Sequence, residues 1–329
     1  MINYVYVEKE AASYPLTEKI LKCFSKSQTI FIDNANDLFN RTNQNYALQK
    51  KFQSLILAVN HGKFVYKASA NCQSFGADNF YYVSACKNCI YNCDYCYLQG
   101  MYRSGNVLVY VNTADCFREV DTLLERTEGD LLLPISYDSD IYALEETLGF
   151  IEAWSDYLET KDERLTAELR TKCGTMQFLD KIRAKKNFVV TWSLNPDEII
   201  KRYEKRTSPL EDRLKAIEYA LSLGIRTRVA IDPVIAACDT LDAYRNLAKR
   251  LAPFAEKLDG VSVGMFRIPT DFLKIMRKNA KTSPLSWDDY DVFGRTKTYS
   301  KEISEKYLSA IVEELVSAGV PAGKISVQC

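Results

Sequence analysis

The sequence has only one histidine and no excess of charge of either sign. With His61 as the single imidazole, few side chains other than cysteine can serve as ligands of a soft transition metal. The 43 Lys and Arg residues balance the 43 Asp and Glu residues, so the whole molecule has no strong attraction for a polyanion. A nucleic-acid surface on this chain must therefore be local.

Long apolar runs are also missing. Runs such as NFVVTW are far shorter than the roughly 20 apolar residues of a membrane-spanning helix. The first residues, MINYVYVEKEAASYP, lack the basic and apolar regions of a secretory signal. We therefore expect a cytoplasmic protein with no membrane association.

Cysteine, in contrast, is plentiful, with ten residues of which four lie in CKNCIYNCDYCYLQG, residues 86–100. In a reducing compartment such a cluster indicates metal binding or catalysis rather than disulfides. Cys86, Cys89, Cys93 and Cys96 could close a four-thiolate zinc site. Cys89, Cys93 and Cys96 alone form C-x3-C-x2-C and could hold three corners of a 4Fe-4S cluster, leaving one iron open. We favour the open cluster, because the two knuckles of a zinc ribbon normally stand well apart in sequence.

From residue 80 onward, apolar strands alternate with amphipathic helical patterns such as 209–224 and 239–258. The pattern predicts an α/β fold with a parallel sheet, right-handed crossovers and helices on its faces, which we interpret as a partial TIM-type (βα)6 barrel. The predicted strands are 80–85, 131–136, 167–172, 187–194, 227–235 and 260–266, with an extra strand at 106–111.

Residues 1–78 form a mixed N-terminal extension, with a helix after Pro15 and strands at 29–33 and 55–60. No Gly- or Ser-rich linker follows, so we expect the extension to pack on the barrel domain, residues 79–329.

Polar residues lie at the ends of several predicted strands, and the cysteine loop directly follows the first strand of the set. Because the carboxyl ends of parallel strands meet at one edge, these residues should line one mouth. They are Ser136–Asp140, Thr171, Lys172, Ser193, Asn195, Asp232 and Arg267. A structural zinc loop has no reason to lie at such a convergence.

The cysteine triplet followed by Tyr97 resembles the signature of radical S-adenosylmethionine enzymes. Further segments resemble successive landmarks of the spore photoproduct lyase family, in the right order and over roughly residues 65–329. They are CDYCYLQ (93–99), YDSDI (137–141), RTK (170–172), WSLNPDEIIKRYEKRTSPLEDRLKAI (192–217), IDPVI (231–235), GMFRI (264–268) and FGRTKTYS (293–300).

The resemblance implies direct reversal of 5-thyminyl-5,6-dihydrothymine in DNA by a 5'-deoxyadenosyl radical made from S-adenosylmethionine at a 4Fe-4S cluster. It implies that Cys89, Cys93 and Cys96 hold the cluster. Damaged DNA is the implied substrate, and an electron donor such as ferredoxin or flavodoxin is the implied partner. The cofactor-binding residues that we assign are Tyr97, Ser139, Asp140, Lys172, Ser193 and Asp232.

The same resemblance implies DNA contacts by Arg267, Arg295, Lys297 and Tyr299, the last three in a segment similar to a lesion-gripping hairpin. Basic stretches at 181–186, 201–206 and 274–282 are further candidates for DNA contacts, although each also fits a solvated helix face.

One position departs from the family. Members often carry a cysteine two residues before the matched serine, as hydrogen donor to the thymine radical, and Tyr137 stands there. Tyr137 could itself donate, but a thiol from elsewhere is attractive, and Cys72 and Cys86 are the main candidates, with Cys173 third. Tyr95 and Tyr97 are possible relays back to the nucleoside, or packing residues of the loop.

Two other functions remain open from the sequence. One is a related radical enzyme with a different substrate. The other is a non-enzymatic four-cysteine metal protein that binds nucleic acid through its basic helices.

Overall fold

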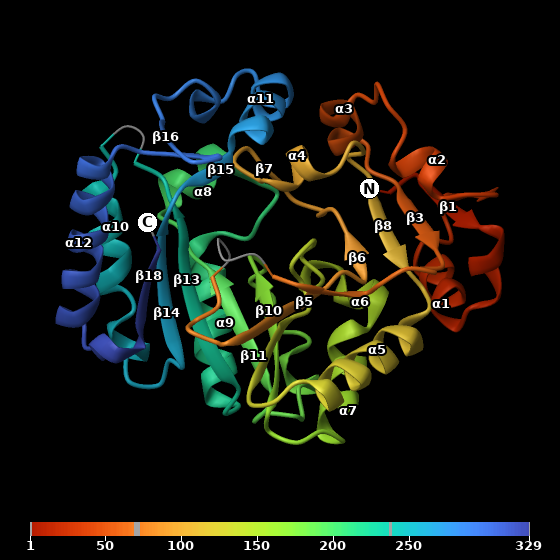
Figure 1. Cartoon of the computed structure of the whole chain (residues 1–329), viewed down its shortest axis with the longest axis horizontal. Helices are drawn as coiled ribbons and strands as arrows, with labels where there is room; N and C mark the ends of the chain where they lie inside the picture. The colour runs from red at the N-terminus through yellow and green to blue at the C-terminus, as the bar shows by residue number, and fades with distance from the viewer. Residues whose placement is uncertain (1, 69–72, 237–238, 329) are drawn as a thin grey trace.

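The computed structural model of the chain describes residues 2–68, 73–236 and 239–328. Its main body is an eight-stranded sheet curled into a half-barrel, with helices on its outer face (Figure 1). The strands, in their order across the sheet, are β18 (Ile325–Gln328), β14 (Gly260–Met265), β13 (Arg226–Val234), β11 (Phe188–Ser193), β10 (Leu165–Thr171), β9 (Leu131–Pro134), β5 (Asn79–Val83) and β4 (Val65–Lys67).

The six predicted barrel strands are confirmed, and all five of their neighbouring pairs are parallel. Every residue of β11 and β14 is buried, as expected for strands covered on both faces. The predicted α/β half-barrel is thus confirmed. Its sheet is wider than six strands, because β18 adds a parallel strand at one edge and β4 an antiparallel strand at the other.

The helices between the strands bury one apolar stripe each against the sheet. They include α5 (Thr113–Arg126), α7 (Phe150–Glu159), α8 (Asp197–Tyr203), α9 (Leu210–Ser222), α10 (Leu241–Lys249) and α12 (Lys301–Ser317). Helix α9 matches the prediction for 209–224. The prediction of one helix over 239–258 is wrong in its second half, because α10 ends at Lys249 and a separate 3-10 turn, Ala252–Phe254, contains Pro253.

The N-terminal extension builds a second sheet, in the order β2-β1-β3-β8-β6. The predicted strands at 29–33 and 55–60 are β2 (Gln28–Ile32) and β3 (Leu55–Ala58), whereas β1 (Tyr4–Glu8) was not predicted. The segment 106–111, which the sequence grouped with the barrel, contributes β8 (Val107–Tyr110) to this second sheet, parallel to β3. Short β6 (Cys86–Lys87) then pairs with β8. Helices α1 (Pro15–Cys23), α2 (Asn36–Phe39) and α3 (Tyr46–Lys51) complete the extension.

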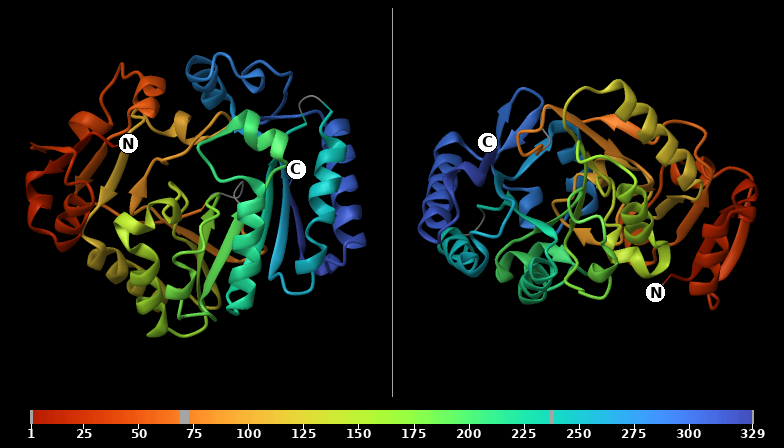
Figure 2. Two further views of the ribbon diagram at one scale, coloured as in Figure 1. Left: turned by 180° about the vertical axis from the view of Figure 1, so that it is seen from behind. Right: turned by 90° about the horizontal axis from the view of Figure 1, so that it is seen from below.

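A small three-stranded sheet lies near the C-terminal part of the chain, in the order β15-β17-β16. It consists of β15 (Arg267–Pro269), β17 (Thr296–Thr298) and β16 (Asp291–Phe293), and α11 (Thr270–Asn279) follows β15. Figure 2 shows this part of the chain at the same end of the molecule as α3. Within the described ranges, no helix has the length and apolar character needed to cross a bilayer.

Candidate functional site

The cysteine loop lies over the carboxyl end of the half-barrel, as predicted. It begins three residues after β5 and includes β7 (Asn92–Cys93) and α4 (Leu98–Met101). Strand β7 pairs with β12 (Glu204–Lys205), so that Cys93 lies opposite Glu204. The loop is therefore fixed on one side to β5 and on the other to the segment that follows β11 and α8.

The three proposed cluster ligands are free, half-buried thiols. The pKa of Cys89 is raised to about 12, mainly by burial, with smaller contributions from Asp140 and Cys96, whereas Lys50 opposes the shift. Burial also raises the pKa of Cys93, which Lys172 opposes. Thiols of such high pKa need a metal or a nearby cation to bind as thiolates at neutral pH. Three clustered thiols with two cations beside them fit an anionic iron-sulfur cluster.

Cysteine 86 stands apart from these three. It is 3% exposed, and its Sγ lies 3.4 Å from Ser139 Oγ, to which it donates. Burial raises its pKa to about 12 as well. Its partner is thus a hydroxyl beyond the end of β9. Among the described residues, no three His, Cys, Asp or Glu side chains are placed to hold a single metal ion.

Two side chains of the N-terminal extension hold the cysteine loop by its backbone. Lys50 is 3% exposed and donates to the carbonyl oxygens of Cys89 and Tyr91, the latter at 2.8 Å. Gln53 Nε2 donates to the same Cys89 carbonyl at 2.9 Å and to Gly105 O at 2.8 Å. Burial lowers the pKa of Lys50, and the surrounding cysteine thiolates oppose this shift. The sequence analysis missed both residues, because 36 or more positions separate them from the loop.

The turn before Cys89 is held in a left-handed conformation by Asn88, with φ of 67°. Asparagine tolerates this region better than most residues. Its amide donates to Ser104 O at 2.7 Å and Asn106 O at 3.0 Å, and Tyr46 OH donates to its side-chain oxygen at 3.4 Å. These bonds fix the turn that leads into Cys89.

Asp140 and Lys172, both assigned to cofactor binding, come together at the ends of β9 and β10. Thr171 Oγ1 and the Lys172 backbone N–H each donate to the Asp140 carboxylate at 2.8 Å, and Ala143 N–H donates at 3.2 Å. Burial raises the pKa of Asp140, and these hydrogen bonds oppose it. Asp140 therefore joins two strand ends. The half-buried Lys172 ammonium lies 5.8 Å from the centre of the Tyr95 ring.

A buried ion pair supports the loop from the other side. Glu204 and Arg213 form a salt bridge in which both side chains are 0% exposed. Burial alone would raise the pKa of Glu204, but Arg213 and Lys172 lower it below its usual value. Tyr95 OH and Asn195 Nδ2 also donate to Glu204. The sequence analysis gave no role to this pair, although both residues lie in a segment that it quoted.

Four tyrosines form a row of ring contacts at the edge of the site. Tyr97 OH donates to Tyr137 O at 2.8 Å, and the two ring centroids lie 6.0 Å apart. Tyr137 stacks on Tyr82 at 4.3 Å, and Tyr82 stacks on Tyr66 at 5.5 Å. The Tyr137 ring thus lies between the ring of Tyr97, in the cysteine loop, and the ring of Tyr82, in β5. The alternative donor Cys72 falls outside the described residues.

Arg267 and Asp232, predicted to contact DNA and cofactor respectively, bind each other. The Arg267 guanidinium donates to the two Asp232 carboxylate oxygens at 3.1 and 3.0 Å, and also to Gln328 Oε1. Their side chains are 19% and 14% exposed, so solvent reaches them only in part. Buried Ser193 accepts from Arg213 with its backbone carbonyl.

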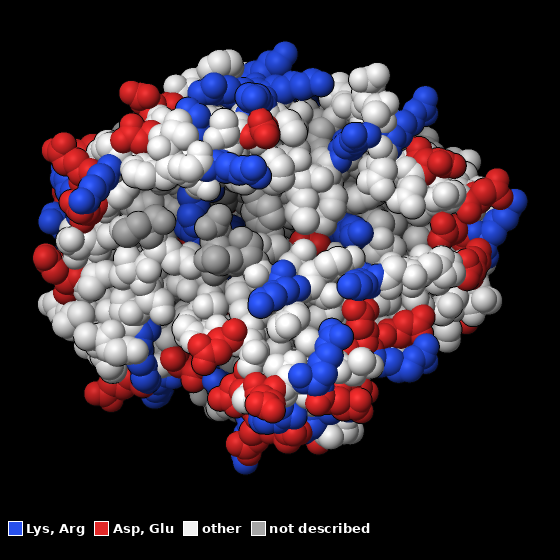
Figure 3. All heavy atoms as spheres, in the orientation of Figure 1, with Lys and Arg blue, Asp and Glu red and all other residues white. Residues whose placement is uncertain are grey.

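The predicted lesion-gripping segment is the hairpin of β16 and β17. Arg295 at its turn is exposed and Lys297 is half-buried. Tyr299 is instead 3% exposed and packs edge-on against Tyr290 with ring centroids 5.3 Å apart, so the structure gives it a place in the core rather than on a DNA-contacting surface. Figure 3 shows Lys and Arg side chains gathered over α11, beside this hairpin.

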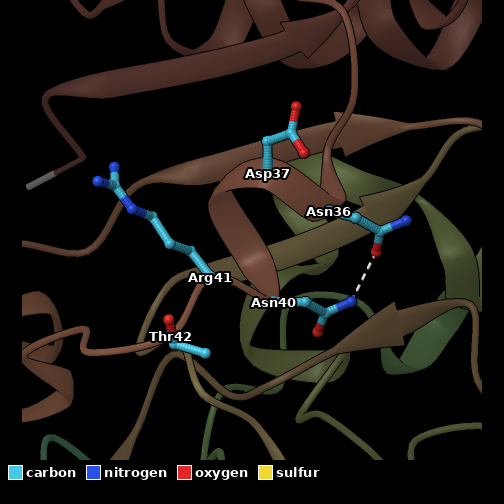
Figure 4. A pocket seen from close by; sticks show the side chains of 5 residues that line it. All are labelled: Asn36, Asp37, Asn40, Arg41 and Thr42. Carbon is cyan, nitrogen blue, oxygen red and sulfur yellow. Dashed lines mark hydrogen bonds between the residues drawn. The ribbon is translucent and has the colours of Figure 1, made fainter.

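A shallow hollow of about 550 Å³ lies on the N-terminal extension (Figure 4). Its lining comes from α2 and the residues after it, and Asn40 donates to Asn36 there at 2.6 Å. None of these residues was predicted to belong to the site.

A family model described as "Spore photoproduct lyase" matches residues 1–326 of this chain. The chain belongs to the spore photoproduct lyase family. The match includes the cysteine loop, both sheets and the C-terminal hairpin. Membership confirms the resemblance inferred from the sequence landmarks.

Two curated relatives agree with this membership. The chain is 24% identical to the spore photoproduct lyase of Clostridium acetobutylicum over 254 residues, which cover 76% of this chain and 74% of the relative. It is 23% identical to that of Bacillus subtilis over 253 residues, covering 75% and 72%.

Solved spore photoproduct lyase structures share the fold. One, complexed with dinucleoside spore photoproduct, has a TM-score of 0.82 at 19% identity and covers 99% of this chain and 98% of its own. Another, a double mutant with bound AdoMet and dinucleoside spore photoproduct, has a TM-score of 0.81 at 20% identity with the same coverage. The roles of individual residues in this chain remain predictions.

Proposed function

We propose that this chain repairs the spore photoproduct in DNA by direct reversal to two thymines, with S-adenosylmethionine as cofactor. The observation that carries the proposal is the family match over residues 1–326 together with a C-x3-C-x2-C loop at the carboxyl end of the half-barrel. Solved relatives named for bound dinucleoside spore photoproduct and AdoMet support the substrate and the cofactor.

The residues that would hold the cluster are Cys89, Cys93 and Cys96. The loop supports an open cluster rather than a closed site, because Cys86 has a separate hydroxyl partner in Ser139. When bound, the cluster supplies the electron that splits S-adenosylmethionine into methionine and a 5'-deoxyadenosyl radical.

The chain's own residues bind and orient the reactants. Lys172 is the cation for the cofactor carboxylate, held at the end of β10 by the bond of its backbone to Asp140. Ser139 is the candidate for the methionyl amino group, and Ser193 for the ribose. Pairing Lys172 with a carboxylate offsets the cost of burying both charges.

The candidates for hydrogen-atom transfer are thiol and phenol groups. Cys72 is our first candidate for the donor to the thymine radical, ahead of Cys86, whose thiol is occupied by a hydroxyl. Tyr97 is the candidate that passes the radical back to the nucleoside, since its ring lies beside Tyr137 at the site edge. Its phenol would give a hydrogen atom to the oxidised thiol and take one from 5'-deoxyadenosine, which restores the 5'-deoxyadenosyl radical. Tyr95 is the other candidate for this step. Its hydroxyl donates to the buried Glu204 carboxylate, whereas the Tyr97 hydroxyl donates to the neutral backbone carbonyl of Tyr137.

The lesion-binding side is the hairpin of β16 and β17 with the neighbouring α11. Arg295 and Lys297 clamp phosphates on either side of a flipped-out lesion, which needs a few local contacts rather than a high net charge. Arg267 is bound to Asp232, so its contribution would be to shape the mouth.

The test is repair of a dinucleotide spore photoproduct by anaerobically reconstituted protein under dithionite. We expect thymidylyl-thymidine as product. Cleavage of S-adenosylmethionine without this product would point to a different substrate. Cys86→Ala should keep its iron and its brown colour, whereas the matched variant Cys89→Ala should lose both. Retention by Cys89→Ala, or loss by Cys86→Ala, would contradict the open three-thiolate site.

A further inference from the structure

The outer face of α3 carries two large apolar side chains in solvent. Leu48 is 52% exposed and Phe52, the residue that caps the helix, is 63% exposed. They are four residues apart and the Phe52 N–H bonds to Leu48 O, so both lie on one face of the helix. Together they form a small contiguous apolar surface, a feature that binding surfaces share.

Basic residues surround this apolar pair. Residues 40–53 contain no Asp or Glu, and their exposed basic residues are Arg41 and Lys51, since Lys50 is buried. The exposed Arg206, from the segment after β12, lies against them and donates to Lys51 O at 3.2 Å and Gln53 Oε1 at 3.4 Å. The one acid in residues 199–208 is Glu204, which is 3% exposed and thus hidden from this surface. We call Leu48, Lys51, Phe52 and Arg206 the α3 patch.

The α3 patch lies directly over the cysteine loop. Lys50 and Gln53, the chain neighbours of Lys51 and Phe52, both donate to the carbonyl of Cys89. One layer of side chains therefore separates the patch from the backbone of a proposed cluster ligand. Figure 1 shows α3 at the same end of the molecule as α4 of the loop.

We propose that the α3 patch is the docking surface of an acidic one-electron carrier of the flavodoxin or ferredoxin type. The inference rests on the proposed function, which requires one electron to enter at the cysteine loop. The reduced carrier loses one electron, the cluster gains it, and no bond is formed or broken. The reaction itself defines neither the binding site nor the charge of this carrier.

The size and the charge of the α3 patch both suit transient binding of an acidic electron carrier. Weak redox complexes bury less than about 1,200 Å² in total, so a small patch is sufficient. A positive rim steers an acidic partner and makes association fall with ionic strength. DNA is the competing ligand for a basic surface. An apolar centre with a charged rim is typical of protein interfaces, whereas phosphate contacts need polar donors throughout.

The test compares two reductants on the reconstituted full-length chain. The rate of S-adenosylmethionine cleavage is measured with the hydroquinone form of a flavodoxin and separately with dithionite, which needs no docking surface. We expect Lys51→Glu and Phe52→Asp to lower the flavodoxin-driven rate at least tenfold and to leave the dithionite-driven rate within twofold. The matched controls Lys26→Glu and Phe31→Asp, exposed residues of the extension outside the patch, should change neither rate.

Flavodoxin binding by calorimetry at two salt concentrations gives a second readout that needs no turnover. Salt-sensitive binding that Lys51→Glu weakens supports the proposal. Unchanged flavodoxin-driven rates in both variants, or weaker binding of a duplex oligonucleotide with unchanged flavodoxin binding, would overturn it. A wild-type protein that cleaves no cofactor under dithionite would instead defeat the proposed function, and the binding measurement would still decide the docking surface.

Discussion

Replacing Arg213 by methionine tests whether the buried ion pair with Glu204 supports the site. The substitution keeps an unbranched side chain but removes the charge from a pair whose side chains are both 0% exposed. Removing one partner of a buried pair costs about 3–5 kcal/mol, because the other charge stays buried and unpaired. Arg213 also donates to Ser193 O at 2.7 Å and Ser208 O at 3.0 Å, and both acceptors lose that donor. We expect a loss at the upper end of this range.

The loss should depend on pH in a defined direction. In the wild type the pKa of Glu204 is lowered, so the pair contributes stability above the unfolded pKa and loses it as the pH falls through the folded value. Without Arg213, burial raises the pKa of Glu204, and the variant loses stability as the pH rises through that value. The wild-type pair has nearly its full effect at both pH 5 and pH 8, because both values lie above the usual pKa of a glutamate. The loss in the variant therefore makes the difference between wild type and variant larger at pH 8 than at pH 5.

Urea unfolding of the apoprotein, followed by circular dichroism at both pH values, measures the free energy of unfolding. The control is Arg250→Met, which breaks the bridge to Glu211 between side chains that are 40% and 56% exposed. Such a pair is worth less than about 1 kcal/mol. A loss for Arg213→Met no larger than that of the control, or equal losses at pH 8 and pH 5, would refute the reasoning.

Three further predictions concern other groups. Lys50→Met should lower the free energy of unfolding by about 1–3 kcal/mol and reduce iron retention, because the carbonyls of the cysteine loop lose a buried donor; unchanged iron content would contradict this. Burial raises the pKa of Glu145 to about 7, so the wild type should lose stability as the pH rises from 5 to 8.5. Glu145→Gln should not show this loss, and parallel pH profiles of stability for the two proteins would contradict the prediction. Cys72→Ala should divert repair to by-products with cofactor cleavage intact, and unchanged product purity would move the donor role to Tyr137 or Cys86, to be tested with Tyr137→Phe and Cys86→Ala.

The half-barrel and the position of its cysteine loop could be predicted because their signals are local. Most barrel strands contain a short apolar run, and the loop follows the first of them within three residues. The end of α10 also had a local signal in Pro253, which the helical pattern concealed. Strand β8 had none, because three of its four residues are buried and an apolar run of this kind fits either sheet.

The contacts that complete the site could not be read from the sequence, because they join distant residues. Arg267 and Asp232 each carried a separate predicted role, and only the fold brings them within 3.0 Å of each other. Tyr299 looked like a surface residue beside basic neighbours, but it lies just after the end of β17, where its ring packs against Phe266 and Tyr290.

The N-terminal extension is part of the site rather than an addition to it. Its strand β4 forms the edge of the barrel sheet beside β5, and its residue Lys50 fixes the backbone of Cys89. The barrel chain in return gives β6 and β8 to the second sheet, and one apolar core contains buried residues of both sheets. A fragment beginning at residue 79 would therefore expose the edge of β5, leave β8 without β3, and remove the donors that hold the cysteine loop. Such a fragment would also lack α3 and with it the proposed docking surface of the electron carrier. The extension is therefore needed to hold the backbone of the cysteine loop and, under the proposed function, to admit the electron that reduces the cluster.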